Sequence, residues 1–130
     1  MEVNKMAGFA VTITEASKEF TARERIMVKD TSNAIKFDEV VTTDSSFVLT
    51  PVAYAVLSVH NEKSKDSKDY QQYIVIADDG NKYITGSCSF WNSFISIWEE
   101  MEGEEQFSIE VYKKDSKNYK GKQFLTCSIV

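Results

Sequence analysis

Residues 82–101 read KYITGSCSFWNSFISIWEEM, and within this stretch the hydrophobic period changes from that of a strand to that of a helix. Residues 82–85 continue a strand, whereas a helical spacing relates Phe90, Phe94, Ile97, Trp98 and Met101. Ser87 or Ser89 is expected to cap this helix, and Gly103 stands where it should end. The stretch therefore predicts a strand followed by one amphipathic helix.

The longest alternating run of the chain precedes this stretch, at residues 47–60. Its apolar face is predicted to contain Phe47, Leu49, Pro51, Ala53, Ala55, Leu57 and Val59. Its polar face is predicted to contain Thr50, Tyr54, Ser58 and His60. The proline indicates that the early part of the strand is bent or lies at a sheet edge.

Three more strands complete the pattern. Residues 69–77 are rich in Tyr, Ile and Val, and the turn at residues 78–81 uses Gly80 for a positive φ before the strand at residues 82–85. After the helix, residues 106–112 and 123–130 alternate again. In the last strand Leu125, Cys127 and Ile129 are expected inward, and Phe124, Thr126 and Ser128 outward.

The first third of the chain is more ambiguous. Residues 9–14 alternate as a short strand, and Thr21 and Glu24 have capping-box spacing, which favours a short helix. Residues 24–29 are equally compatible with a strand. A turn is expected at residues 30–33 and extended chain at residues 34–41, before a polar connector at residues 42–46.

Five strands with a single helix between the third and fourth are the order of an OB-fold barrel. We therefore predict a mainly β chain whose barrel core comprises residues 47–130. Residues 1–46 are predicted to form an N-terminal extension that packs on or beside the barrel. The 130 residues suit a single domain.

Bulk properties narrow the class of protein. The net charge is -5, no apolar run approaches the roughly 20 residues that span a bilayer, and the N-terminus lacks the pattern of a signal peptide. We expect a cytoplasmic protein without membrane contact. Cys88, Cys127 and His60 are the only cysteines and histidine, so neither a metal site nor a disulfide is expected. No cofactor and no enzymatic constellation are apparent, and we expect a non-enzyme.

Positive charge is distributed unevenly. From residue 46 onward there are nine lysines and no arginine, and eight of the lysines lie within residues 61–70 or 113–122. In an OB-fold barrel these two connections flank the binding face, so the two lysine clusters are predicted to converge. Acidic residues instead collect at residues 99–105, at the end of the predicted helix.

Four stretches carry a resemblance to a known family: TARERIMVKDTSNAIKFDE (residues 21–39), VHNEKSKDSKDY (59–70), YITGSCSFWNSF (83–94) and SKNYKGKQFLTCSIV (116–130). They resemble small single-stranded-DNA-binding proteins encoded by phages and prophages of Gram-positive bacteria. The resemblance implies an OB-fold that covers single-stranded DNA during phage DNA replication or recombination, in the bacterial host cytoplasm. Cellular proteins of this type often end in an acidic tail, which is not expected here.

Single-strand binding needs cations for the phosphates and aromatic faces for the bases. Aromatic residues on polar strand faces or in the loops are the candidates for stacking, with Phe124 the least expected on a polar face. The complete predicted DNA-binding set is Tyr54, His60, Lys63, Lys65, Lys68, Tyr70, Tyr73, Tyr112, Lys113, Lys117, Tyr119, Lys120, Lys122 and Phe124.

Alternative interpretations stay open for these residues. Lysine-rich loops are often only solvated, and Tyr54 or Phe124 can instead pack under the N-terminal extension. Trp91 and Trp98 are assigned to the core or to a subunit interface, and a homo-oligomer is left open. The competing function is a phage protein-interaction or assembly factor that uses the acidic helix end and binds no nucleic acid. Besides single-stranded DNA, replication or recombination proteins are candidate partners.

Overall fold

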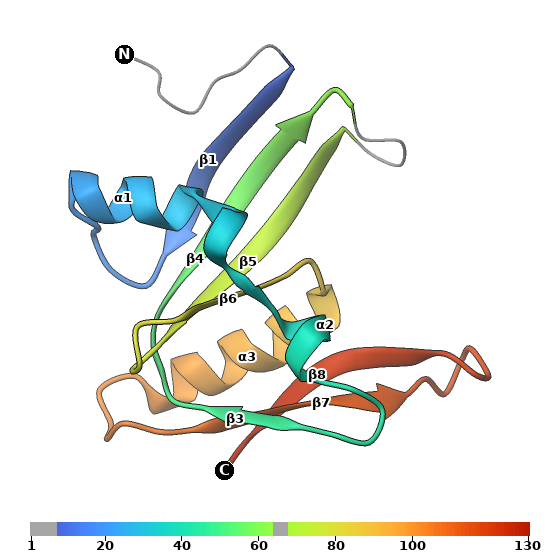
Figure 1. Cartoon of the computed structure of the whole chain (residues 1–130). Coiled ribbons are helices and arrows are strands. Elements are labelled where there is room, and N and C mark those ends of the chain that lie inside the picture. Colours follow the sequence, from blue (N-terminus) through green and yellow to red (C-terminus); the bar gives the residue numbers. More distant parts are fainter. Residues whose placement is uncertain (1–7, 64–67) are drawn as a thin grey trace.

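The computed structural model describes residues 8–63 and 68–130, and it consists of two β-sheets with helices between and beside them (Figure 1). The larger sheet has the strand order β1-β4-β5-β6-β2. Its strands are β1 (Phe9–Ala16), β4 (Pro51–Asn61), β5 (Asp69–Ala77), β6 (Lys82–Thr85) and β2 (Ile35–Lys36). All neighbours are antiparallel except β2, which runs parallel to β6.

The smaller sheet has three antiparallel strands in the order β3-β7-β8. They are β3 (Phe47–Leu49), β7 (Ile109–Asp115) and β8 (Gln123–Ile129). Because β3 leads directly into β4, one stretch of chain passes from the small sheet into the large one. The predicted mainly β class is confirmed.

Side-chain caps define where the helices begin. In α1 (Ala22–Lys29), Thr21 and Glu24 form the predicted capping box, so the helical interpretation of this segment is confirmed. In α3 (Cys88–Met101), the Ser87 hydroxyl accepts a hydrogen bond from the Phe90 amide. A 3-10 turn, η1 (Thr31–Asn33), and a short helix, α2 (Phe37–Val40), complete the set.

The N-terminal third is built into the large sheet. β1 pairs with β4 along its whole length, and β2 pairs with β6, so this third supplies both outer strands. The segment expected to be extended over residues 34–41 is so only at β2, because α2 follows at once and buries Phe37. The N-terminal third therefore belongs to the large sheet through these two strands and does not merely lie beside it.

A β-bulge changes the face on which the long strand presents its residues. The register of β4 against β5 shifts between Pro51 and Ala53, and one extra residue reverses the face of every side chain that follows. Leu49 consequently shares a core with Tyr54, whereas Leu57 lies on the opposite face. The prediction of one unbroken apolar face from Phe47 to Val59 is wrong for this reason.

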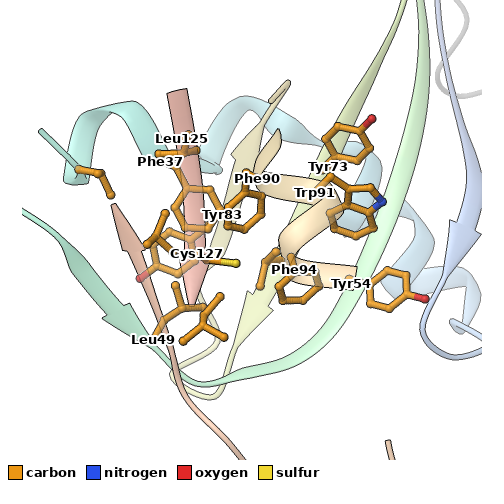
Figure 2. Close-up of a cluster of buried hydrophobic side chains, with 14 of the residues drawn as sticks. Phe37, Leu49, Tyr54, Tyr73, Tyr83, Phe90, Trp91, Phe94, Leu125 and Cys127 are labelled. Carbon is orange, nitrogen blue, oxygen red and sulfur yellow. The ribbon is translucent and has the colours of Figure 1, made fainter. Parts of the chain in front are cut away.

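Two hydrophobic clusters cover the two faces of the large sheet. The main cluster lies between this sheet, the small sheet and α3, and includes the fully buried Phe37, Phe90 and Phe94 (Figure 2). The second cluster lies on the other face and joins the sheet to Phe20 and Val28 from the α1 region. Both faces of β4 and β5 are thus buried, which explains their nearly continuous apolar sequence.

The predicted closed five-stranded barrel is not formed. Among the described residues β6 pairs only with β5 and β2, and β8 pairs only with β7. β8 instead contacts α3, where the Ser89 hydroxyl donates to the Leu125 carbonyl at 2.8 Å and the Ser93 and Thr126 hydroxyls lie 3.0 Å apart. In a closed barrel β6 and β8 would pair with each other. Here β6 pairs with β2 instead, and β8 contacts α3.

Candidate nucleic-acid interface

The β7–β8 hairpin carries the larger lysine cluster on a well-defined turn. The Ser116 amide donates to the Lys122 carbonyl at 2.9 Å, and the Lys122 amide donates to the Tyr119 carbonyl at 3.0 Å. Gly121 closes the turn at a φ of +80°, a conformation that residues with a Cβ rarely adopt. The turn thus holds a fixed backbone from which the lysines project.

Most lysines of this hairpin have no acidic partner. Lys114, Lys117, Lys120 and Lys122 are exposed, and none of them forms an ion pair within the described parts of the chain. Lys113 differs, because it is half-buried and its Nζ lies 3.6 Å from a carboxylate oxygen of Asp38. Four cations are therefore available at this hairpin.

The hairpin differs in charge from the rest of the molecule. Residues 113–122 contain five lysines and one aspartate, a formal charge of +4. The whole chain has a charge of -5, so the remaining residues sum to -9. An anionic polymer is attracted to this hairpin and repelled by the average of the other surfaces.

Aromatic side chains accompany the free lysines. Tyr119 at the tip is 68% exposed. Tyr112 and Phe124 are half-buried on the face of the small sheet that points away from the main cluster, and the Tyr112 hydroxyl lies 2.8 Å from the Ser128 hydroxyl. The outward placement predicted for Tyr112 and Phe124 agrees with this arrangement.

Lys114 belongs to this surface although it was not among the predicted residues. It lies directly opposite Phe124 in the β7–β8 register, on the same face of the sheet. Lys114 could have been identified by aligning its strand in the sequence with the strand that contains Phe124, which places the two residues opposite each other. We call Tyr112, Lys114, Lys117, Tyr119, Lys120, Lys122 and Phe124 the hairpin surface.

The β4–β5 hairpin is different because Lys68 and His60 have acidic partners. Lys68 Nζ lies 3.1 Å from Glu62 Oε2, and the two ring nitrogens of His60 each lie 2.7 Å from a carboxylate oxygen, of Glu62 and of Asp69. Hydrogen bonds to Asp69 and then to Glu62 raise the pKa of His60 above its usual value. This end of the sheet is therefore close to neutral.

The remaining predicted residues of the β4–β5 hairpin contribute little to a cationic surface. Lys63 is exposed, and Tyr70 is half-buried against the second cluster. Lys65 lies outside the described residues. Phosphate binding at this hairpin would have to compete with the carboxylates of Glu62 and Asp69 for the same cations.

Tyr54 and Tyr73 are buried, which corrects their assignment to a binding face. The Tyr54 ring meets Trp91 edge-on at 5.2 Å between centroids, and the Tyr73 ring stacks on Trp91 at 4.7 Å (Figure 2). Burial and then the hydrogen bond to Cys88 raise the pKa of Tyr73 to about 12. Neither ring is free to stack on a base, because both are buried. For Tyr54 the cause is the bulge in β4, which turns this side chain inward.

The two lysine-rich hairpins do not adjoin each other. In Figure 1 the ends of β4 and β5 lie at the top right, whereas the β7–β8 hairpin projects to the right from the lower part of the molecule. The expectation that the two lysine clusters converge on one binding face is therefore wrong. Since β6 pairs with β2 and not with β8, no ladder among the described residues holds the two sheets together at this side.

Other classes of site are not apparent in the described parts. Residues 8–63 and 68–130 contain no group of three His, Cys, Asp or Glu side chains placed to hold a metal ion. None of the helices in these ranges has the length and apolar character needed to cross a membrane. Comparison of the chain with protein-family models, curated proteins and solved structures found no match.

Proposed function

We propose that this protein binds single-stranded DNA, without strong sequence preference, through the hairpin surface. The observation that supports this most strongly is that one hairpin carries four unpaired lysines and the 68% exposed side chain of Tyr119. Lysines neutralise phosphates, and an exposed aromatic ring stacks on a base of any kind because every base has a π-face. The hairpin surface is the part of the described chain where both requirements are met together.

The balance of forces makes this binding electrostatic in the first place. Each lysine that contacts a phosphate of a single strand releases counterions, so the logarithm of affinity falls with the logarithm of salt by about 0.7 per contact. Stacking on Tyr119 adds roughly 1–3 kcal/mol for one base. Tyr112 and Phe124 are half-buried and extend the stacking platform along the sheet.

The chain's resemblance to phage and prophage single-stranded-DNA-binding proteins supports DNA as the ligand. We therefore place the activity in phage or prophage DNA replication or recombination, in the cytoplasm of a bacterial host. We further propose that residues 47–130 are an open variant of the OB-fold. With the continuous segment β3–β4 counted as one strand, these residues form five strands with α3 between the third and fourth, which supports this proposal. The missing β6–β8 ladder distinguishes the arrangement from a closed barrel.

Titration of a fluorescently labelled oligothymidylate at two salt concentrations tests the proposal. We expect binding at low salt that weakens at high salt. Tyr119→Ala should reduce the affinity by about 1–3 kcal/mol, and Lys120→Ala combined with Phe124→Ala should reduce both the affinity and its salt dependence. Neither variant should unfold the protein, which circular dichroism can verify.

Lys68→Ala is the matched control, because Lys68 lies in the other hairpin and is paired with Glu62. Its affinity for the oligothymidylate should stay close to that of the unmodified protein. The proposal fails if no binding is observed at low salt, or if Lys68→Ala weakens binding as much as Tyr119→Ala does.

A second candidate function uses the acidic end of α3 as a docking site for another protein. The residues there are exposed, and none forms an ion pair in the part of the chain that the structure describes: Glu99, Glu100, Glu102, Glu104 and Glu105. Under this hypothesis the protein is a phage interaction or assembly factor. It would capture a basic protein partner in a pull-down and ignore oligonucleotides in the titration above.

A further inference from the structure

A pocket of about 490 Å³ lies on the opposite side of the large sheet from α3, beneath α1. Its wall is formed by α1, by the segments before and after it, and by the ends of β4, β5 and β6. The apolar lining residues are Phe20, Met27, Val28, Val52, Ala53 and Ile76. This volume lies within the roughly 300–1,000 Å³ typical of small-molecule sites.

The pocket continues the second hydrophobic cluster toward solvent. Phe20 and Val28 form its buried part and are 6% and 3% exposed. Met27 and Val52 lie where the cluster ends, and they are exposed despite their apolar side chains. The β4 bulge contributes directly, because Val52 is the residue at which the β4–β5 register shifts. An apolar ligand would cover surface that the protein itself leaves in water.

Lys82 lines this pocket, and the hydrogen bonds of its ammonium group are incomplete. Lys82 Nζ donates to the carbonyl oxygens of Met27 and of Asp30, the latter at 2.7 Å, and so uses two of its three N–H groups. Lys82 forms no ion pair within the described residues. The carboxylate of Asp30 accepts hydrogen bonds from the amide and the hydroxyl of Ser32 instead.

Two of the other charged residues that line the pocket, Lys18 and Glu24, are paired with each other. Lys18 Nζ lies 3.1 Å from Glu24 Oε2. Burial lowers the pKa of Lys82, whereas the charge of Asp30 opposes that shift. A partly buried ammonium with neutral hydrogen-bond partners gains more from an additional anion than a solvated lysine does.

We propose that this pocket binds a small amphipathic carboxylate, with its apolar chain against Phe20, Val28 and Val52 and its carboxylate on Lys82. The site is separate from the hairpin surface and does not depend on the proposed function. Complementarity of both kinds selects the ligand class: the apolar lining takes the chain, and the remaining N–H of Lys82 takes the anionic head.

Decanoate and decanol are suitable probes because they share an apolar chain and differ in the charged head. We expect decanoate, kept below its micelle concentration, to shift the methyl NMR signals of Val28, Val52 and Ile76 in the full-length protein. Decanol should bind at least several-fold more weakly. The absence of methyl shifts with decanoate, or equal affinities for the two probes, would overturn the proposal.

Two neighbouring residues of α1 provide a matched pair of variants. Met27 is 58% exposed and lines the pocket, whereas Ile26 is 56% exposed and does not line it. Met27→Glu should weaken decanoate binding at least tenfold, and Ile26→Glu should leave it unchanged. Equal effects of the two substitutions would contradict the assignment of the site.

Lys82→Gln tests the role of the cation separately. It should bring the ratio of decanoate to decanol affinity close to one while decanol binding persists. A ratio that stays as high as in the unmodified protein would exclude Lys82 as the anion partner. Because the readout is a ratio on the same variant, a modest loss of stability does not affect its interpretation. Oligothymidylate binding by Met27→Glu should be unchanged, so the two proposals can fail independently.

Discussion

Individual residues owe their roles to the partners that surround them rather than to their type. Tyr54 and Tyr119 are both tyrosines near polar sequence, yet one is 8% exposed and the other 68%. Tyr54 contributes to the free energy of folding by packing on Trp91, whereas Tyr119 adds nothing to the core. The lysines divide in the same way, since Lys68 is paired with a carboxylate and Lys120 is not.

His60 leads to a prediction on pH dependence. Its pKa is raised by hydrogen bonds to Asp69 and Glu62, so its protonation stabilises the folded state. This contribution should be complete below the ordinary histidine pKa of about 6.5 and should disappear as the pH rises through the higher pKa of the folded state. An NMR titration of the imidazole signals measures the pKa directly.

Asp69→Asn combined with Glu62→Gln is the control for this titration. The two substitutions replace the charged carboxylates by neutral amides of similar size, and the pKa of His60 should return toward that of an unstructured histidine. An unchanged pKa in this double variant would show that the two carboxylates are not the cause of the shift.

Among the elements, α3 links the two sheets through its first turns. The Ser87 hydroxyl caps the helix at the Phe90 amide, and the Ser89 hydroxyl donates to the Leu125 carbonyl of β8. Phe90 and Phe94 bury their rings in the main cluster one and two turns into the helix. The helix therefore replaces, by side-chain contacts, part of what a β6–β8 ladder would provide.

Removing the Ser89 hydroxyl should weaken this link. Ser89→Ala deprives the Leu125 carbonyl of its 2.8 Å donor, and we expect a loss of about 1 kcal/mol in the free energy of unfolding. Urea denaturation provides the measurement. Ser96→Ala is the matched control on the exposed side of α3, where the structure shows no hydrogen bond of the side chain, and it should change the stability by less than about 0.5 kcal/mol.

Across the whole molecule, charge and core are segregated. The β7–β8 hairpin is strongly positive within an acidic chain, and the aromatic residues of the main cluster lie away from it between the two sheets (Figures 1 and 2). A ligand on the hairpin surface would approach Tyr119 and Phe124 without reaching either tryptophan.

Tryptophan fluorescence should therefore change little when oligothymidylate binds. Trp91 is buried, and Trp98 is partly buried against the same cluster, so both indoles lie away from the hairpin surface. A titration followed by both intrinsic fluorescence and the signal of the labelled oligonucleotide makes the comparison. Strong quenching of the tryptophans at saturation would indicate that binding disrupts the main cluster or takes place elsewhere.

Much of the local structure could be predicted from sequence. The capping box at Thr21 and Glu24, the strand Asp69–Ala77 and the turn at Gly80 all have local causes, namely side-chain caps, alternation and a positive φ. The helix 88–101 follows from its apolar spacing. Of the candidate site, Lys117, Tyr119, Lys120 and Lys122 could be identified, because side chains at the end of a charged hairpin stay exposed to solvent.

From residue 47 onward, the kinds of element, their order and the gathering of positive charge in two connections could be predicted, because these depend on neighbouring residues. The other features depend on tertiary contacts. The bulge after Pro51 reversed the faces of β4 and buried Tyr54, and Glu62 paired with Lys68 of one lysine cluster. β6 pairs with β2, and β8 contacts α3, so β6 and β8 do not pair with each other. Each outcome depends on contacts between residues distant in the chain. The alternation of apolar and polar residues in a strand does not reveal which face those contacts will bury.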